Sequence, residues 1–372
     1  AVVARGMGKC CVSGAGDIVV DYAKRNFSVN GTIIKEGDWI SLNGSTGEVY
    51  LGKVETEDAT LDEDFTAIMN LAEKYTRMYV RTNADTPKDA RKARDFGAKG
   101  VGLCRTEHMF FEGHRIDAMR EMILSDTVEG RRDALNKILP MQRGDFEGIL
   151  EAMNGLGVTI RLLDPPLHEF TPNEPASQQY MAQKLGIPVE RIKEKVDALH
   201  EFNPMLGHRG CRLGVTYPEI TEMQARAIIE AACNLKLRGL DPRPEIMVPL
   251  VGTVKELKQQ AEIINRVAAM VFEEKGVKVD YKVGTMIEIP RAAITADQIA
   301  EVAEFFSFGT NDLTQMTFGY SRDDAGKFLP EYIRKGILKT DPFAVLDQEG
   351  VGRLVEMGVK LGRKTNADLK VG

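Results

Sequence analysis

Charged side chains recur at one end of apolar segments in this chain. A lone arginine after an apolar segment is usually a surface residue, but here three arginines and three carboxylates share that position. Glu288 is the most informative of them, because it lies inside the apolar segment 284–289 and a buried carboxylate needs a cation or hydrogen-bond donors. The residues concerned are Arg105, Arg161, Asp164, Arg209, Glu288, Asn311 and Asp312.

These residue types together indicate a particular chemistry. Guanidinium groups bind phosphate and carboxylate groups with two parallel hydrogen bonds. Two carboxylates with open positions between them suit Mg²⁺, which usually completes its coordination with substrate oxygens. The set therefore predicts a site for a small phosphorylated carboxylic acid, in which Mg²⁺ polarises an oxygen and arginines neutralise a phosphoryl group in transfer.

From residue 77 onward, apolar runs alternate with helical patterns. The clearest helix spans 253–274, where Thr253 and Glu256 offer a capping box and Gly276 a stop. Another helix follows Pro218 and ends near Gly239. This alternation predicts an α/β fold with a parallel sheet, and a (β/α)₈ TIM-type barrel is favoured, whose active site lies at the carboxyl ends of the strands. The predicted strands are 78–81, 100–104, 158–163, 245–251, 282–289 and 305–309.

The first part of the chain has a different character. Residues 1–52 contain short β-type runs separated by Gly, Asn, Asp and Ser, too few to build a sizeable core of their own. Residues 53–77 begin acidic and become helical, which predicts a linker helix. We therefore expect three parts: the remainder of a small β-rich domain at 1–52, the linker at 53–77, and a barrel, incomplete at its carboxyl terminus, at 78–372.

Composition excludes several classes of protein. The 372 residues carry a net charge of −6, which argues against nucleic acid as a partner. No apolar stretch approaches the ~18 residues needed to span a bilayer. The cysteines are five in number and scattered, which suits a reducing compartment better than a disulfide framework. None of the five histidines is paired by sequence with an acid that would orient it as a base.

At the charged segments the sequence resembles the pyruvate, phosphate dikinase family. The resemblance covers essentially the whole chain. Two sister families, phosphoenolpyruvate synthase and enzyme I of the sugar phosphotransferase system, share the motif beginning at Gly309, and the residues after Arg105 favour the dikinases. The matching segments are AVVARGMGKCC (1–11), GLCRTEHMF (102–110), LGHRG (206–210), GTMIEIPRA (284–292) and GTNDLTQMTFGY (309–320).

The resemblance implies a swivelling phosphohistidine domain followed by a barrel that binds phosphoenolpyruvate (PEP). The full enzymes of this family interconvert ATP, pyruvate and phosphate with AMP, PEP and diphosphate. In this sequence, the resemblance makes Glu288 and Asp312 the Mg²⁺ ligands and Asp164 a supporting carboxylate. The substrate-binding residues that it implies are Arg105, Arg161, Asp164, Arg209, Glu288, Gly309, Thr310, Asn311 and Asp312.

The resemblance also implies that two catalytic residues lie outside this sequence. The family's carrier histidine would come just before Ala1, and its acid–base cysteine just after Gly372. We therefore expect no catalytic residue within the chain, no turnover by the chain alone, and reduced stability of an unclosed barrel. The domains that bind ATP and phosphate would lie upstream. The family further suggests a homodimer, in the cytoplasm or, in a plant, the plastid. A sister enzyme and an inactive PEP-binding fragment stay open as alternatives.

Overall fold

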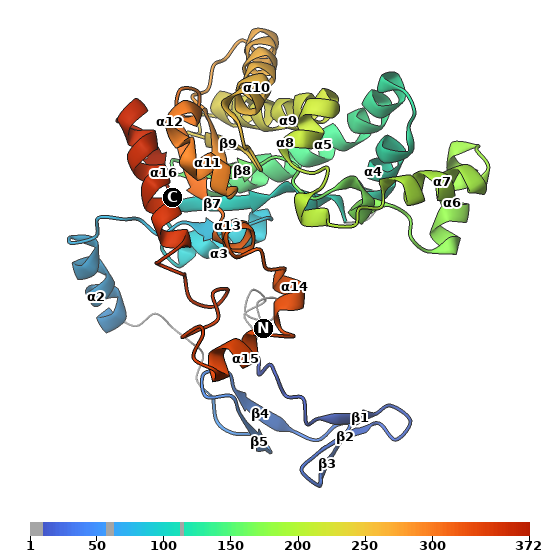
Figure 1. Cartoon of the computed structure of the whole chain (residues 1–372), viewed down its shortest axis with the longest axis vertical. Coiled ribbons are helices and arrows are strands. Elements are labelled where there is room, and N and C mark those ends of the chain that lie inside the picture. Colours follow the sequence, from blue (N-terminus) through green and yellow to red (C-terminus); the bar gives the residue numbers. More distant parts are fainter. Residues whose placement is uncertain (1–9, 57–62, 112–114) are drawn as a thin grey trace. The chain divides into compact units, whose positions relative to one another are not determined.

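The computed structural model describes residues 10–56, 63–111 and 115–372, and the chain divides into two units, Ala1–Met78 and Tyr79–Gly372 (Figure 1). Each unit is described by itself. Within the described residues, no helix combines the length and apolar character needed to cross a bilayer.

The first unit contains two small antiparallel sheets and a helix. The sheets bury little, since Ile34 is the sole buried residue among those described in this unit. This agrees with the expectation that the stretch lacks a core of its own. The elements are β1 (Val19–Asp21), β2 (Asn26–Val29) and β3 (Thr32–Lys35) in one sheet, β4 (Ile40–Asn43) and β5 (Glu48–Leu51) in the other, and α2 (Glu63–Glu73).

The second unit is built on a single parallel sheet of seven strands, so the predicted α/β class is confirmed. The strand order β12-β11-β10-β9-β8-β7-β6 follows the chain, and each neighbouring pair is parallel. The strands are β6 (Thr82–Asn83), β7 (Gly100–Arg105), β8 (Gly157–Arg161), β9 (Arg243–Val248), β10 (Lys282–Ile287), β11 (Phe305–Phe308) and β12 (Lys370–Val371).

The predicted strand at 78–81 is wrong, because the apolar side chains of Met78, Tyr79 and Val80 are exposed and the strand begins at Thr82. The two predicted helices are confirmed. Thr253 and Glu256 form a capping box, and Gly276 ends that helix with a φ of 65°. The helices are α3 (Pro87–Asp95), α4 (Arg115–Leu124), α5 (Val128–Ala152), α6 (Pro175–Leu185), α7 (Val189–Leu199), α8 (Cys211–Thr216), α9 (Pro218–Leu237), α10 (Val254–Lys275), α11 (Pro290–Ile294), α12 (Ala296–Ile299), α13 (Thr310–Phe318), α14 (Arg322–Ala325), α15 (Leu329–Arg334) and α16 (Val351–Thr365).

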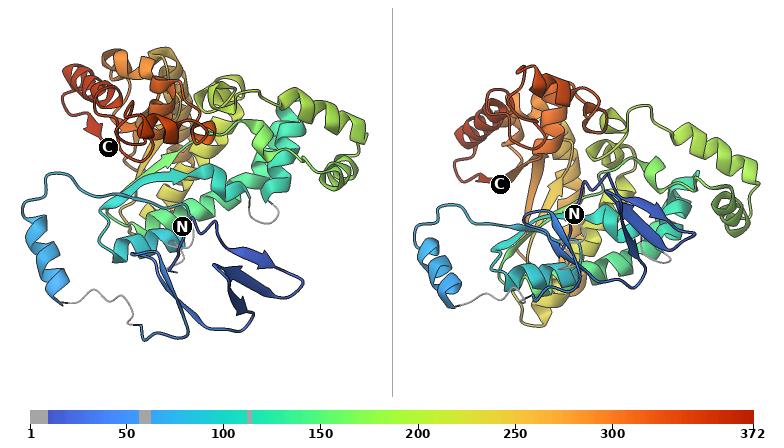
Figure 2. Two further views of the ribbon diagram at one scale, coloured as in Figure 1. Left: turned by 60° about the horizontal axis from the view of Figure 1, so that its bottom comes forward. Right: turned by 90° about the horizontal axis from the view of Figure 1, so that it is seen from below.

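One face of each strand packs on helices and the other points into the curve of the sheet (Figure 2). Val158, Ile246 and Val248 join the main core with residues of α5, α9 and α10. Because side chains alternate along a strand, the neighbouring positions face inward. A small apolar cluster inside the curve consists of Leu103, Met247, Met286 and Phe305.

Toward the amino end of β9, two residues before Met247, Glu245 contacts residues from both edges of the curled sheet. Its carboxylate accepts hydrogen bonds from Arg81, just before edge strand β6, and from Lys370 in β12, the opposite edge. Thr159 on β8 donates to the same carboxylate over 2.8 Å. Both edges of the sheet therefore approach its central strand, β9. We call these residues, Arg81, Thr159, Glu245 and Lys370, the basal layer.

Candidate active site

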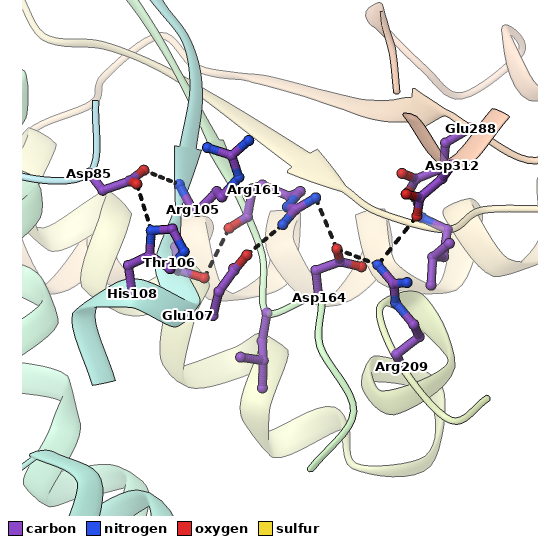
Figure 3. Close-up of polar contacts among 12 residues, drawn as sticks. Asp85, Arg105, Thr106, Glu107, His108, Arg161, Asp164, Arg209, Glu288 and Asp312 are labelled. Atoms are coloured by element: carbon purple, nitrogen blue, oxygen red, sulfur yellow. Dashed lines mark hydrogen bonds and ion pairs between the residues drawn. The ribbon is translucent and has the colours of Figure 1, made fainter. Parts of the chain in front are cut away.

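The predicted arginines and carboxylates come together at the carboxyl ends of the strands (Figure 3). Strand alternation explains why they point inward. Arg105 lies two residues beyond Leu103, and Glu288 two beyond Met286, so each shares the inward face of its apolar neighbour. Arg161 ends β8 in the same way, two residues beyond the basal Thr159.

Arg161 lies at the centre of this group. It is 8% exposed, and its two terminal nitrogens contact different carboxylates: Glu107 at 2.5 Å and Asp164 at 2.9 Å. Burial works against its charged form, but the carboxylates of Asp164, Glu107 and Glu288 outweigh burial and raise the pKa of the guanidinium. Arg161 is therefore held as a cation. Glu107 is a partner that sequence reasoning missed; it lies in a short 3₁₀ helix with no apolar periodicity.

Arg209 extends the group from a separate segment. Its Nη2 atom lies 2.6 Å from Asp164 and 3.4 Å from Asp312. Gly210 sets its position, because this residue has a φ of 58° and its amide donates to the carbonyl oxygen of Asp164. A Cβ on Gly210 would also come within 3.0 Å of Leu250. Glycine thus allows the turn that brings Arg209 beside Asp164.

Glu288 is the most deeply buried carboxylate of the group, at 2% exposure. One carboxylate oxygen accepts the amide hydrogen of Leu250 over 2.7 Å. Burial and the neighbouring carboxylates of Asp164 and Asp312 raise the pKa of Glu288 to about 8. In the absence of a ligand, this side chain therefore retains a proton at neutral pH.

The group holds more negative than positive charge. Even with Glu288 protonated, three carboxylates face two guanidinium groups, and several atoms of the group are buried without a hydrogen-bond partner among the described residues, including Glu107 Oε2, Asp164 Oδ1 and Arg209 Nε. Buried polar atoms are normally paired, so these atoms mark a place for a ligand. We call these residues, Glu107, Arg161, Asp164, Arg209, Glu288 and Asp312, the site cluster.

The predicted segment after β11 lies beside the cluster. Gly309 approaches Glu288 so closely that a Cβ at this position would come within 2.8 Å of its Cβ atom. Asn311 donates to Asp312 over 2.9 Å and accepts from Arg322 over 2.6 Å. Thr310 is exposed, and in the described part of the chain its side chain has no hydrogen bond to the cluster. Glycine at 309 therefore leaves space beside the buried carboxylate.

Arg105 differs from the other two arginines. Its backbone amide donates to Asp85 over 2.7 Å, but within the described ranges its guanidinium forms no ion pair. A half-buried guanidinium without a carboxylate partner is available to an anionic ligand. The structure thus brings Arg161 and Arg209 into one network and leaves Arg105 unpaired beside it.

His108 shows an arrangement that the sequence did not indicate. Its Nδ1 atom lies 2.7 Å from Asp85, whose other oxygen holds the Arg105 amide. This hydrogen bond raises the pKa of His108. The expectation that no histidine has an orienting acid is therefore wrong for His108. The acid is 23 residues away, in the loop after the two-residue strand β6, where no apolar pattern marks it.

The cysteines near the cluster are not activated. Burial raises the pKa of Cys211 to about 12, and the pKa of Cys104 is also raised by burial. Nucleophilic cysteines have lowered rather than raised pKa values. Neither thiol is therefore suited to covalent chemistry.

No cluster of three or more His, Cys, Asp or Glu side chains arranged for a metal is found among the described residues. Glu288 and Asp312 nonetheless fit a Mg²⁺ site that takes only two of its ligands from the protein. The site cluster has an excess of carboxylates, and Mg²⁺ usually binds through one or two carboxylates plus substrate oxygens. A divalent cation would balance the charge that now raises the pKa of Glu288.

Comparison with known proteins agrees with the two-unit organisation. Residues 60–367 match the family described as PEP-utilising enzyme, PEP-binding domain, and residues 1–47 match PEP-utilising enzyme, mobile domain.

Individual relatives are similar over the whole chain. The identity is 58% to the pyruvate, phosphate dikinase of Clostridium symbiosum and 57% to that of Giardia intestinalis. It is also 57% to pyruvate, phosphate dikinase 1, chloroplastic, of Arabidopsis thaliana. In each comparison all of this chain is covered, but it spans 43%, 42% and 39% of these relatives, respectively.

Proposed function

This chain belongs to the PEP-utilising enzymes, and we propose that it carries the pyruvate–PEP half of a pyruvate, phosphate dikinase reaction. In this half-reaction the phosphorus–nitrogen bond of a phosphohistidine breaks and a bond forms between phosphorus and the enolate oxygen of pyruvate. The whole protein would couple this step to ATP and inorganic phosphate, giving AMP and diphosphate. The observation that carries the proposal is the site cluster, with its unpaired buried atoms and excess of carboxylates.

The three arginines would divide between two roles in binding the ligand. Arg105, whose guanidinium lacks a carboxylate partner, would bind an oxygen of the incoming anion directly. Arg161 and Arg209 both contact Asp164, and their Nε atoms, which lack a hydrogen-bond partner among the described residues, would be left to donate to the phosphoryl group. Because the guanidinium positions are fixed before the ligand binds, little reorganisation is needed when charge develops in the transition state.

Glu288 and Asp312 would hold Mg²⁺ in this site. When bound, the ion supplies charge neutralisation for the phosphoryl and enolate oxygens. Glu288 would lose its proton as the cation arrives, because its raised pKa reflects burial and the carboxylates around it. Asn311 would orient Asp312 through their hydrogen bond, and Gly309 and Thr310 would border the substrate.

The remaining assignments also belong to this proposal. Residues 1–52 would form the last part of the mobile domain, 53–77 the linker, and 78–372 the PEP-binding domain. The carrier histidine and the acid–base cysteine would be supplied by the whole protein, so that the 372-residue chain binds PEP without turnover. The protein would act as a homodimer, in the cytoplasm or, as the name of the Arabidopsis relative records for that protein, in a chloroplast.

Isothermal titration calorimetry of the chain with PEP tests this function. We expect saturable binding with Mg²⁺ and none detectable with a chelator. Arg266→Lys is a suitable control, because Arg266 is an exposed residue of α10 that pairs with Glu222 outside the site. Absence of PEP binding by the folded chain, or binding that is equally tight without Mg²⁺, would contradict the proposal.

A further inference from the structure

We infer that Gln224, a residue of α9 outside the ligand site, positions Arg161 and its two carboxylate partners. The inference rests on the proposed function, because it concerns the geometry of the same site. Gln224 has no exposed surface, and its carboxamide reaches from the helix to the loops after β7 and β8. It would be a positioning residue, since it contacts neither reacting group.

The hydrogen bonds of Gln224 join the two loops directly. Its Oε1 atom accepts the amide hydrogen of Leu163 over 2.8 Å, and its Nε2 atom donates to Thr106 Oγ1 over 3.0 Å. Thr106 in turn donates to the carbonyl oxygen of Arg161 over 3.0 Å. One buried amide thereby links the segments that carry Glu107 and Asp164.

The order of residues explains why this link matters for Arg161. Thr106 precedes Glu107, and Leu163 precedes Asp164. These two carboxylates contact Arg161 from different sides, through Nη2 and Nη1 respectively. If the two loops separated or shifted, both ion pairs would change, and the guanidinium would lose its fixed orientation. Gln224 therefore sets the spacing within which Arg161 is held.

The direction of each hydrogen bond is also determined. Because the Leu163 amide can only donate, the oxygen of the Gln224 carboxamide must face it, and the nitrogen must face Thr106. The Thr106 hydroxyl then accepts from Gln224 and keeps its own hydrogen for the Arg161 carbonyl. An ionised carboxylate at this position accepts but cannot donate, so it would draw the Thr106 hydrogen to itself and release the Arg161 carbonyl.

Three variants of the chain, studied with Mg²⁺ and PEP by calorimetry, test the inference. Gln224→Leu removes the hydrogen bonds to Leu163 and Thr106, together with a longer one to Gln142, and we expect at least about tenfold weaker binding. Gln224→Glu keeps the shape but loses the donor when ionised. Its affinity, taken relative to wild type at each pH, should recover as the pH falls, because the protonated acid regains a donor. Gln142→Leu is the matched control.

Gln142 is buried at 1% exposure, and it contacts Gln224 at 3.5 Å and Met109 at 3.8 Å. Among the described residues it has no hydrogen bond to Thr106 or Arg161. Its loss should lower stability but change PEP affinity by less than about twofold. If Gln224→Leu and Gln142→Leu destabilise the fold equally and leave affinity unchanged, Gln224 has only a structural role. If Gln224→Leu does not fold, the pH dependence of PEP binding by Gln224→Glu is the deciding measurement. An affinity ratio of Gln224→Glu to wild type that does not change with pH overturns the inference.

A second measurement separates this inference from the proposed function. The ¹⁵Nε resonance of Arg161, assigned with Arg161→Lys, reports the environment of its guanidinium without any ligand. We expect it to shift in Gln224→Leu and to stay in place in Gln142→Leu. A chain that shows this shift but does not bind PEP contradicts the proposed function alone. An unchanged resonance in a chain that binds PEP contradicts the inference alone.

Discussion

Glu245 in the basal layer and Glu288 in the site cluster are both buried glutamates on the inner side of one sheet. Burial disfavours ionisation of both, yet the pKa of Glu245 is lowered and that of Glu288 is raised to about 8. Glu245 accepts hydrogen bonds from Lys370 and Arg81 on both oxygens, whereas Glu288 has carboxylates as its neighbours. A network in which every carboxylate is paired stabilises a fold, whereas a network with too few cations for its carboxylates is suited to bind one from solution.

The largest expected effect is a loss of stability when the ion pairs of the basal layer are broken. Glu245→Ala leaves Arg81 and Lys370 without their carboxylate partner, and loss of one partner of a buried ion pair costs about 3–5 kcal/mol. We expect urea denaturation to show a loss of this size in the free energy of unfolding. PEP affinity of the protein that remains folded should be unchanged. A loss below about 1 kcal/mol would show that the basal layer does not stabilise the sheet.

For the site cluster we expect the reverse: substitutions should weaken PEP binding and leave stability intact. Glu288→Gln and Asp312→Asn remove carboxylates from a group that has an excess of them, so stability at pH 9 should not fall. PEP affinity in the presence of Mg²⁺ should decrease about 100-fold, and the remaining binding should no longer depend on the ion. Calorimetry with and without a chelator measures both effects. Retained Mg²⁺ dependence would place the metal elsewhere.

The pKa of Glu288 predicts how stability varies with pH in the absence of ligand. A carboxyl whose pKa is raised in the folded state binds its proton more tightly there than in the unfolded chain. Its contribution is therefore greatest below the ordinary glutamate pKa of 4.5 and is lost as the pH rises through about 8. Between pH 6 and pH 8.5, urea denaturation should show a larger loss of stability for wild type than for Glu288→Gln. Equal losses would mean that Glu288 does not titrate in this range.

A smaller change is expected for Arg161→Lys. Lysine keeps the positive charge but cannot contact Glu107 and Asp164 with two nitrogens at once. PEP binding should weaken about tenfold, since hydrogen bonds to charged groups contribute about 1.5–3 kcal/mol. The control is Arg226→Lys, because Arg226 also bridges two glutamates, Glu230 and Glu274, but outside the site. Equal affinity of wild type and Arg161→Lys would exclude the proposed role.

The smallest effect concerns His108, at the solvent-exposed border of the site. Its contact with Asp85 raises its pKa above the usual 6.5. The stabilisation is present below pH 6.5 and is lost as the pH rises through the folded-state pKa. An NMR titration should show this elevated pKa, and Asp85→Asn should return it toward 6.5. If the pKa is the same in both proteins, the pair does not form in solution.

The sequence predicts where several single side chains of the site lie, but it does not predict which side chains contact one another. Arg105, Arg161 and Glu288 could be placed because parallel strands end at one edge of a sheet and side chains alternate along each strand. No such rule applied to Glu107 or Asp85. These residues lie in a 3₁₀ helix and a loop, and their partners depend on which loops meet in three dimensions.

The basal layer was missed for a related reason. Glu245 lies in a largely apolar segment, and Arg81 directly precedes the two-residue strand β6. Lys370 belongs to a two-residue strand far away in sequence. No local pattern in the sequence marks any of these residues. Their contacts form only because the curl of the sheet brings its two edges to β9.

This curl also couples the motions of the two edges. Strands β6 and β12 each have a neighbour on one side only, and edge strands of two residues would ordinarily fray independently. Arg81 and Lys370, however, share the carboxylate of Glu245. Opening of one edge admits water to this buried carboxylate, and water screens the ion pair that remains, so the hold on the other edge weakens as well. Amide hydrogen exchange at β6 and β12 should therefore occur in a common opening event, although the strands lie at opposite ends of this unit's sequence.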